Sequence, residues 1–305
     1  MPQATRDIKR RIKSVGSTKK ITKAMEMVSA AKMRKAVAKV LATRSYADLA
    51  WETVLHLVKK IDTAKHPFFQ KNKNIKKVAV VLVSTNRGLC GSFNTQILQK
   101  VIDSIKLHHP ESQVTDIISC GTKGRDEVRK QKLNLIADFH KEDITQKSLD
   151  IRPIAHMITK DFIEKKYDKV FVAFTDYMTA LKQVPHMKQL LPITTDIDER
   201  LGHIIHEKEN TINKIDVDSF ADFVFEPNTK EVLNAFLPRL VEVQIYQAVL
   251  ESEASEHSAR MMAMRNATEA AEEMVDDLTL AYNQARQAGI TAEIAEISAG
   301  SAALK

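Results

Sequence analysis

The chain has 305 residues and a formal net charge of +7, and aromatic residues make up only 6% of it. This length allows one large domain or two smaller ones, and the scarcity of aromatics and glycine favours long helices over an all-strand fold. The longest apolar run, Val78–Val83, has six residues, whereas a membrane-spanning helix needs about 20. We therefore expect no direct membrane span. Cys90 and Cys120 are too few for a disulfide framework and suit a reducing compartment.

The first part of the chain, residues 1–66, is predicted to be a long helix. The 50 residues between Gly16 and Pro67 contain neither Gly nor Pro, the main helix breakers. A helix of that length would extend roughly 75 Å, more than the roughly 50 Å diameter of a compact globule of this chain length. It must therefore project from any globular domain, and its apolar stripe needs a cover. We assign that stripe to Ile8, Ile12, Val15, Ile21, Met25, Val28, Val54, Val58 and Ile61.

The middle of the chain, residues 67–227, alternates between strand and helix patterns. The run Lys77–Ser84 is rich in β-branched residues, which is typical of a buried parallel strand. Further strands are predicted at Val114–Cys120 and Lys169–Thr175, and helices at Phe93–His108, Lys123–Lys132 and Ile144–Lys166. This alternation predicts an α/β sandwich with a mostly parallel sheet. We expect residues 62–76 to link the sandwich to the first helix, and Asp196–Asp218 to form a long charged loop.

The last part, residues 228–305, is predicted to be a second long helix. The 50 residues between Pro238 and Gly289 again contain neither Gly nor Pro. Asn228 is a candidate N-cap with Glu231 in a capping box, and Pro238 is expected to kink or interrupt the helix. Steps of three and four residues from Leu240 select fourteen positions, eleven of them apolar, which indicates a left-handed coiled coil. The positions are Leu240, Val243, Gln247, Leu250, Ala254, His257, Met261, Met264, Thr268, Ala271, Val275, Leu278, Tyr282 and Ala285.

Opposite charges predict that the two long helices pair with each other. Residues 1–60 contain 15 Lys/Arg against 4 Asp/Glu, a net charge of +11, whereas residues 239–305 contain 5 against 11, a net charge of −6. Charge complementarity of this kind selects a partner more than it strengthens the pair. With the middle of the chain folded as one domain, the two helices would form an antiparallel two-helix coiled coil.

Two Gly-containing turns follow predicted strands and form the candidate site of the α/β domain. The first carries Arg87, Gly88, Cys90 and Gly91, and the second carries Gly124 and Arg125. Such a turn could hold a phosphate on its backbone N–H groups, but neither matches GxGxxG or GxxxxGK[ST], and we interpret both as structural turns. No His, Cys or carboxylate grouping has the spacing of a catalytic or metal site. We therefore expect no catalysis, no cofactor and no metal ion.

A basic segment near the start of the chain leaves a second function open. Arg6–Lys13 could bind nucleic acid as a helical arm on the α/β domain, although residues 1–60 hold only Tyr46 and Trp51 as stacking aromatics. A steep salt dependence of nucleic-acid binding would identify that function. A third alternative, an α/β enzyme with a helical oligomerisation arm, requires turnover by the isolated chain.

Several motifs, in the same order along the chain, resemble those of gamma subunits, the central stalks of F-type ATP synthases. The stretches Ile21–Val28 and Ala30–Arg34 resemble the N-terminal signature of that family. The strongest match is Ala285–Ile297, which resembles the C-terminal signature. Shorter matches lie at Arg87–Gly91, which resembles the RGLCG turn of the family, and at Lys123–Asp126 and Gln189–Pro192.

The resemblance implies a non-catalytic rotor shaft inside a ring of alternating alpha and beta subunits, which make or hydrolyse ATP. The α/β domain would rest on the membrane ring of c subunits and bind the epsilon subunit, without binding nucleic acid. The chain would then be peripheral to the cytoplasmic face of a bacterial inner membrane. By family match, Lys23 and Met25 face the lever of the beta subunit, and the upper bearing contains Arg286, Gln287, Thr291, Glu293 and Glu296.

Overall fold

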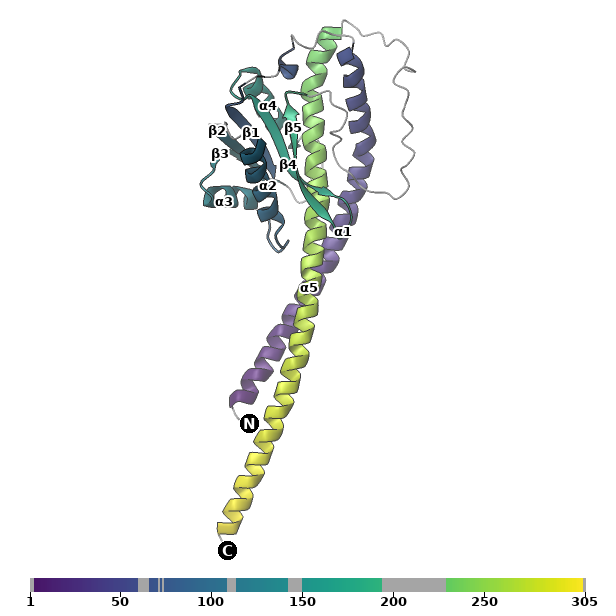
Figure 1. The fold of residues 1–305 in the computed structure, drawn as a ribbon. Coiled ribbons are helices and arrows are strands. Elements are labelled where there is room, and N and C mark those ends of the chain that lie inside the picture. Colours follow the sequence, from purple (N-terminus) through teal and green to yellow (C-terminus); the bar gives the residue numbers. More distant parts are fainter. Residues whose placement is uncertain are drawn as a thin grey trace. The chain divides into compact units, whose positions relative to one another are not determined.

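A computed structural model describes residues 3–59, 66–70, 72, 74–108, 114–141, 150–193 and 229–303. The chain divides into two compact units (Figure 1). One, here called the helix-pair unit, comprises Met1–Ala30 and Arg260–Lys305, and the other, the sheet unit, comprises Ala31–Ala259. Two long helices, α1 (Gln3–Lys59) and α5 (Thr229–Ala303), contribute residues to both units.

Both predicted long helices are present, and each runs through a glycine. Helix α1 has 57 residues and includes Gly16, and α5 has 75 residues and includes Gly289. Pro238, predicted to kink or interrupt the helix, lies inside α5, which continues through it as one helix, so the helix is not interrupted there. The predicted cap Asn228 lies outside the described residues, as do the predicted loop Asp196–Asp218 and residues 62–65, 71 and 73 of the link.

In the helix-pair unit, α1 and α5 run antiparallel. The Oγ1 atoms of Thr22 and Thr268 are 2.8 Å apart, and Lys19 Nζ lies 2.8 Å from a carboxylate oxygen of Glu272. The pairing therefore advances along α5 as it goes back along α1. On α5 the predicted seam is confirmed, because all of its positions in this unit are buried or half-buried: Met261, Met264, Thr268, Ala271, Val275, Leu278, Tyr282 and Ala285.

On α1 the predicted stripe is only partly confirmed. Ile8, Ile12, Val15 and Met25 are half-buried, but Ile21 and Val28 are 60% and 56% exposed. The spacing that begins at Ile8 continues instead through Lys19, Thr22 and Ser29, and the last two are buried. Helix geometry thus decided which face meets α5, and two apolar residues beside that face remain exposed.

The sheet unit contains a five-stranded sheet in the order β3-β2-β1-β4-β5. Strands β1 (Lys77–Val83), β2 (Val114–Cys120), β3 (Asn134–Phe139) and β4 (Lys169–Tyr177) are parallel, and β5 (Gln183–Leu191) pairs antiparallel with β4. The predicted mostly parallel sheet is confirmed. The sequence reading missed β3 and β5, which are its two edges.

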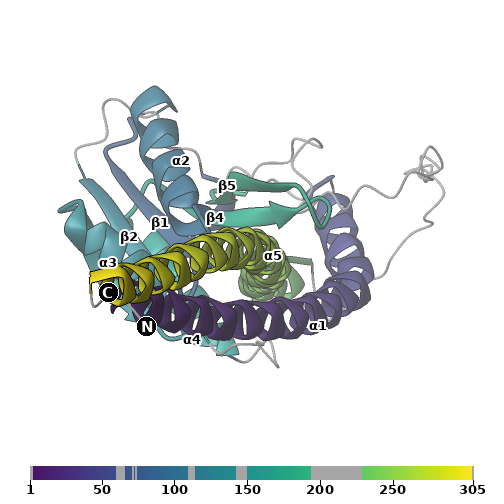
Figure 2. The same ribbon diagram turned by 90° about the horizontal axis from the view of Figure 1, so that it is seen from below.

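The central strand β1 divides the core into two layers. Val78, Val80 and Leu82 face α2 (Phe93–His108) and α3 (Thr122–Lys130), whereas the intervening residues face α4 (Arg152–Ile163) and α5. Figures 1 and 2 show α2 and α4 on opposite sides of the sheet. Because successive side chains of a strand point to opposite faces, the continuous apolar run of β1 suits a sheet covered on both sides. A short 3₁₀ helix, Pro67–Phe69, adds two phenylalanines to the α4 side.

The other predicted boundaries fit closely, with one exception. Helix α2 and strand β2 have the predicted bounds, whereas α4 is shorter than the predicted Ile144–Lys166. Within the described residues, α4 begins with Pro153 in its first turn and ends at Ile163. Lys165 then adopts a φ of 58°, the left-handed conformation that commonly follows a helix.

Candidate functional site

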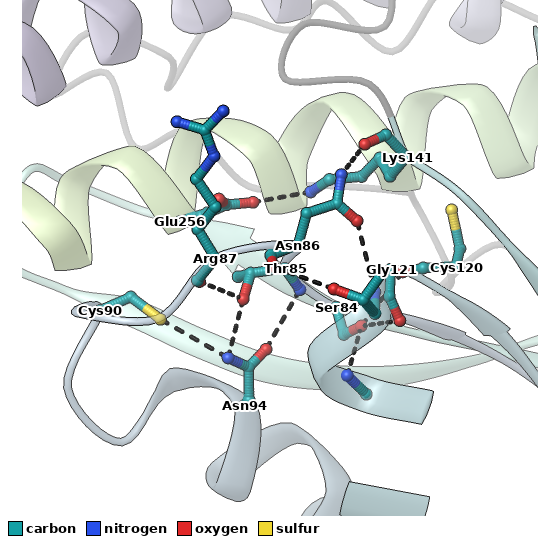
Figure 3. Close-up of polar contacts among 12 residues, drawn as sticks. Ser84, Thr85, Asn86, Arg87, Cys90, Asn94, Cys120, Gly121, Lys141 and Glu256 are labelled. Carbon is teal, nitrogen blue, oxygen red and sulfur yellow. Dashed lines mark hydrogen bonds and ion pairs between the residues drawn. The ribbon is translucent and has the colours of Figure 1, made fainter. Parts of the chain in front are cut away.

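The turns after β1 and β2 are joined to each other through Ser84 (Figure 3). Its Oγ lies 3.2 Å from the carbonyl oxygen of Cys120 and 3.1 Å from that of Gly121, and it accepts the Gly124 N–H at 2.9 Å. Gly121 has a φ of 115°, and a Cβ there would lie 2.6 Å from Ser84 Oγ. Glycine at positions 121 and 124 therefore allows α3 to start directly against the end of β1.

The chain itself occupies the N-terminus of α3. The Thr122 N–H donates to Asn86 Oδ1 at 3.3 Å, the Lys123 N–H to the Thr85 carbonyl at 2.9 Å, and the Gly124 N–H to Ser84 Oγ. These are the donors that an anion at a helix N-terminus would need. Because protein atoms already accept them, the geometry supports a structural turn rather than a phosphate cradle.

The predicted turn Arg87–Gly91 is held from below by Asn94. Asn94 Oδ1 accepts the Thr85 N–H at 3.1 Å, and its Nδ2 donates to Thr85 Oγ1 at 2.8 Å and lies 3.5 Å from Cys90 Sγ. Cys90 is buried, whereas Arg87 and Gly91 are exposed. The two ends of the turn are therefore exposed to solvent, while Asn94 anchors the turn to the start of α2.

The cysteines do not have the environment of nucleophiles. Both are buried and neither forms a disulfide, and burial raises the pKa of the Cys120 thiol to about 11. A thiol with that pKa is protonated at neutral pH and is a poor nucleophile. Arg125, predicted with the second turn, is half-exposed and pairs with Asp126 and Asp138 at 2.9 and 3.3 Å. In the part of the chain that the structure describes, no cluster of side chains could hold a metal ion.

A buried ion pair, which sequence reasoning missed, joins α5 to the end of β3. Lys141 Nζ lies 2.7 Å from a carboxylate oxygen of Glu256, and the two side chains are 3% and 7% exposed. Burial by itself lowers the pKa of Lys141, but the carboxylates of Glu256 and Glu253 more than offset this, so that its pKa lies above the usual lysine value. The Asn86 side chain also donates to the Lys141 carbonyl, which connects the pair to the turn after β1 (Figure 3).

Apolar side chains lie exposed along both helices of the helix-pair unit. On α5, Ile290, Ile294 and Ile297 are 49%, 62% and 73% exposed and share one helix face. On α1, Met27 is exposed together with Ile21 and Val28. Contiguous exposed apolar residues indicate an interaction surface. The spacing of four and three residues between the isoleucines was the signal available in the sequence.

Comparison with known proteins identifies the family. The family model described as ATP synthase matches residues 4–304. The ATP synthase gamma chain of Roseiflexus castenholzii is 41% identical over 302 residues, which are 99% of this chain and 98% of the relative. That of Coxiella burnetii is 36% identical over 301 residues, 98% and 99% of the two chains. The chain belongs to the ATP synthase gamma chain family.

Solved structures agree with this family in fold. A chain of the Euglena gracilis mitochondrial ATP synthase, from a cryo-EM structure of OSCP, F1 and c-ring in rotational state 3, has a TM-score of 0.66 at 19% identity. The match covers 99% of this chain and 94% of that one. A chain of the central stalk and c-ring of the Tetrahymena thermophila enzyme has a TM-score of 0.59 at 22% identity, with 81% and 99% covered. The long helices and central sheet are therefore a gamma chain fold.

The residues predicted from the gamma family signatures do not form one cluster. Lys23 is exposed, and its Nζ lies 2.9 Å from Oε2 of Glu26, whereas Met25 is half-buried. Arg286 begins the C-terminal group, roughly 30 Å further along α5 than the level of Lys23, at 1.5 Å per residue. The five C-terminal residues, Arg286, Gln287, Thr291, Glu293 and Glu296, are all exposed. None of the helices in the described part of the chain has an apolar stretch of the length that a membrane span requires.

Proposed function

We propose that the chain is the central rotor shaft of an F-type ATP synthase. It couples ion-driven rotation of the membrane c-ring to ATP synthesis or hydrolysis on the alpha/beta ring, and it is a non-catalytic subunit of that complex. The observation that carries the proposal is the exposed end of α5 in a chain of the gamma family. From Ile290 to Ser301 every residue is exposed, including three isoleucines on one face.

The unequal surfaces of the helix pair supply a mechanism. One face exposes Ile21 and Val28 of α1, whereas α5 carries acidic residues such as Glu272 and Glu273. A beta subunit that meets one face after another would be stabilised in different conformations, because a contact shifts a conformational equilibrium only if it differs between the states. The coupling is reciprocal, since a nucleotide that alters the beta subunit must then favour one angle of the shaft.

The proposed contacts follow the family match. Lys23 and Met25 face the lever of the beta subunit, and the exposed residues from Arg286 to Glu296 lie in the upper bearing of the alpha/beta ring. The sheet unit, with the Arg87–Gly91 turn on its surface, contacts the c-ring and the epsilon subunit. The chain is peripheral to the membrane, on the cytoplasmic face of the bacterial inner membrane, as suits a chain whose relatives include bacterial gamma chains.

Co-expression with alpha and beta subunits from the same source tests this function. We expect a complex that holds one copy of the chain and whose ATP hydrolysis depends on it. Replacing Arg286, Gln287 and Thr291 together by Ala should leave the fold intact, because all three are exposed, and should weaken assembly or coupled activity. Unchanged coupled activity would remove these residues from the bearing.

A matched control replaces the same three residue types on the sheet unit. Thr95, Arg129 and Gln131 are also exposed, and their replacement by Ala should change neither assembly nor hydrolysis. If the chain instead forms no complex and binds RNA or DNA in a salt-sensitive way, the nucleic-acid arm is the correct function. The family assignment gives that alternative no support.

A further inference from the structure

Within the sheet unit, α5 passes through a stretch in which it is enclosed on every side. All residues from Gln247 to Ser258 are buried, although several of them are charged or hydroxylated. A helix that is buried all round is normally apolar, and buried polar groups need partners. Two of these polar residues, Glu256 and Ser258, are bound by different parts of the sheet unit.

The first contact comes from the end of β3. The Lys141–Glu256 pair has a length of 2.7 Å and is almost fully buried. In surroundings of low dielectric constant, the attraction between two charges is far stronger than in water. Lys141 is itself fixed, because its carbonyl accepts a hydrogen bond from the Asn86 side chain. A movement of Glu256 relative to the sheet therefore stretches a strong contact to a fixed residue.

The second contact comes from the hairpin between β4 and β5. Ser258 Oγ donates to the Ala180 carbonyl at 2.6 Å and accepts from Gln183 Nε2 at 3.2 Å. Gln183 Nε2 also lies 3.1 Å from the Ala180 carbonyl. The three groups form a closed set of polar contacts between the hairpin and the helix. Hydrogen bonds weaken steeply when they are misaligned, so this set also resists displacement of the helix.

The two contacts lie on opposite sides of α5. Residues two positions apart on a helix are separated by about 200° around the axis and about 3 Å along it. Lys141 thus holds one side of the helix, and the hairpin holds the other side at nearly the same level. Two forces on opposite sides of an axis resist rotation about it without pushing the helix sideways.

We propose that Lys141–Glu256 and Ser258–Ala180–Gln183 form a torsional clamp that makes α5 turn together with the sheet. The clamp transmits torque between the sheet unit and the helix that continues into the helix-pair unit. A third contact lies on the hairpin side, since Gln247 is eleven residues before Ser258 and therefore within about 20° of it around the helix. There Thr43 Oγ1 of α1 lies 2.9 Å from Gln247 Oε1.

This inference rests on the proposed function as a shaft, and its test measures torsional stiffness in the assembled complex. A bead attached to Lys130→Cys, at a side chain that is 77% exposed, reports the angle of the sheet unit against an immobilised alpha/beta ring. Cys90 and Cys120 are buried and should not react. The angular variance of the bead during catalytic pauses is inversely proportional to the stiffness between bead and ring.

The first variant replaces the ion pair by apolar side chains, Lys141→Met with Glu256→Met. Such a replacement of a buried pair often preserves stability, so thermal unfolding should change little while the angular variance rises. Losing either contact should increase the variance, and losing both should increase it more than losing either alone. A purely structural role for the pair would leave the variance unchanged.

The second variant, Ser258→Ala, has a closely matched control in Ser255→Ala. Both serines are buried in the same stretch of α5, but Ser255 Oγ has no hydrogen-bond partner among the described residues. We expect Ser258→Ala to raise the variance and Ser255→Ala to leave it at the wild-type value. This comparison decides the question even if the Met variant does not assemble.

The outcomes separate the clamp from the shaft. A wild-type complex that rotates, with Ser258→Ala as stiff as Ser255→Ala, overturns the clamp and leaves the shaft function standing. A wild-type chain that forms no rotating complex overturns the shaft function and the clamp with it. Higher variance in Ser258→Ala alone, with ATP hydrolysis at the unloaded rate preserved, supports both.

Discussion

Gly121 stands where α3 begins, and no other residue type fits there without strain. Its φ of 115° is rarely adopted by residues with a side chain, and a Cβ would lie 2.6 Å from Ser84 Oγ and 2.7 Å from the Ser84 carbonyl oxygen. We expect Gly121→Ala to lower the free energy of unfolding by roughly 2–4 kcal/mol, through backbone strain and overpacking. Urea unfolding of the full chain measures this change.

Gly88→Ala is the control for that substitution. No heavy atom of the described residues lies within 4 Å of a Cβ built at Gly88, so the free energy of unfolding should change by no more than about 0.5 kcal/mol. Equal effects of the two substitutions would show that the contact with Ser84 is unimportant. The resemblance at Lys123–Asp126 pointed to the turn after β2. The reason for a glycine at position 121 became clear only from the close approach of β1 and α3 in the structure.

Asp168 makes the stability of the sheet unit depend on pH. Its carboxylate accepts the N–H groups of Lys76 and Lys77, each at 2.9 Å, and the Asn72 amide at 2.6 Å. Burial alone raises the pKa of Asp168, but these hydrogen bonds outweigh it and hold the pKa below the usual carboxyl value. The folded chain therefore favours the ionised carboxylate at the start of β1.

The sign of the effect follows from the lowered pKa. The stabilisation is complete above the unfolded pKa of about 3.9 and is lost as the pH falls through the lower folded pKa. Asp168→Asn should therefore unfold at a lower urea concentration than the wild type at neutral pH. The difference between the two midpoints should shrink below about pH 4. A difference that stays constant down to the acid limit of folding would contradict this account.

At the scale of elements, the sequence predicted the central strands well and the edges of the sheet poorly. Strands β1 and β4 have continuous apolar runs rich in β-branched or aromatic residues, because both faces are covered, and β2 has the shorter run Ile117–Ile118. The missed strand β5 contains Pro185 and several polar residues, which an edge strand tolerates and a central strand does not. The missed strand β3 is short, and its side chains alternate between exposed and half-buried. Pro153 could have located the start of α4.

The helix seam shows a different limit of prediction. Periodicity correctly identified the residues of α5 that face α1. On α1, however, the apolar residues and the residues that helix geometry places against α5 are not the same. The seam includes Thr22 and Ser29, while Ile21 and Val28 are exposed. Pattern reading counts apolar residues and so assigned them to the wrong face. Likewise, Lys141 and Glu256 are 115 residues apart, and no spacing in the sequence indicates that they meet.

At the scale of the whole chain, the two units are stabilised in different ways. The sheet unit has large apolar clusters on both sides of its sheet. The helix-pair unit has a narrow seam in which Thr22, Ser29 and Thr268 are among the buried residues. Such a seam buries little apolar area, and helical stability in proteins comes mostly from tertiary packing. The helix-pair unit therefore depends on partner subunits to cover its exposed apolar residues.

The isoleucine stripe at the end of α5 tests that dependence. Replacing Ile290, Ile294 and Ile297 together by Gln should change the unfolding free energy of the isolated chain by no more than about 0.5 kcal/mol, because the three side chains are exposed. Burying an isoleucine contributes about 1.5–3 kcal/mol, so loss of three should weaken binding to the alpha/beta ring by at least about a hundredfold. Titration of labelled chain into the ring measures the affinity.

Leu107→Gln provides the comparison, because Leu107 is 76% exposed but belongs to α2 of the sheet unit. This variant should bind the alpha/beta ring as tightly as the wild type. If the triple variant also retains its affinity, the end of α5 is not a binding surface and its isoleucines need another explanation. If the triple variant unfolds by itself, the stripe contributes to the fold of the isolated chain. Loss of affinity with an unchanged fold is the result that a shaft seated in a bearing requires.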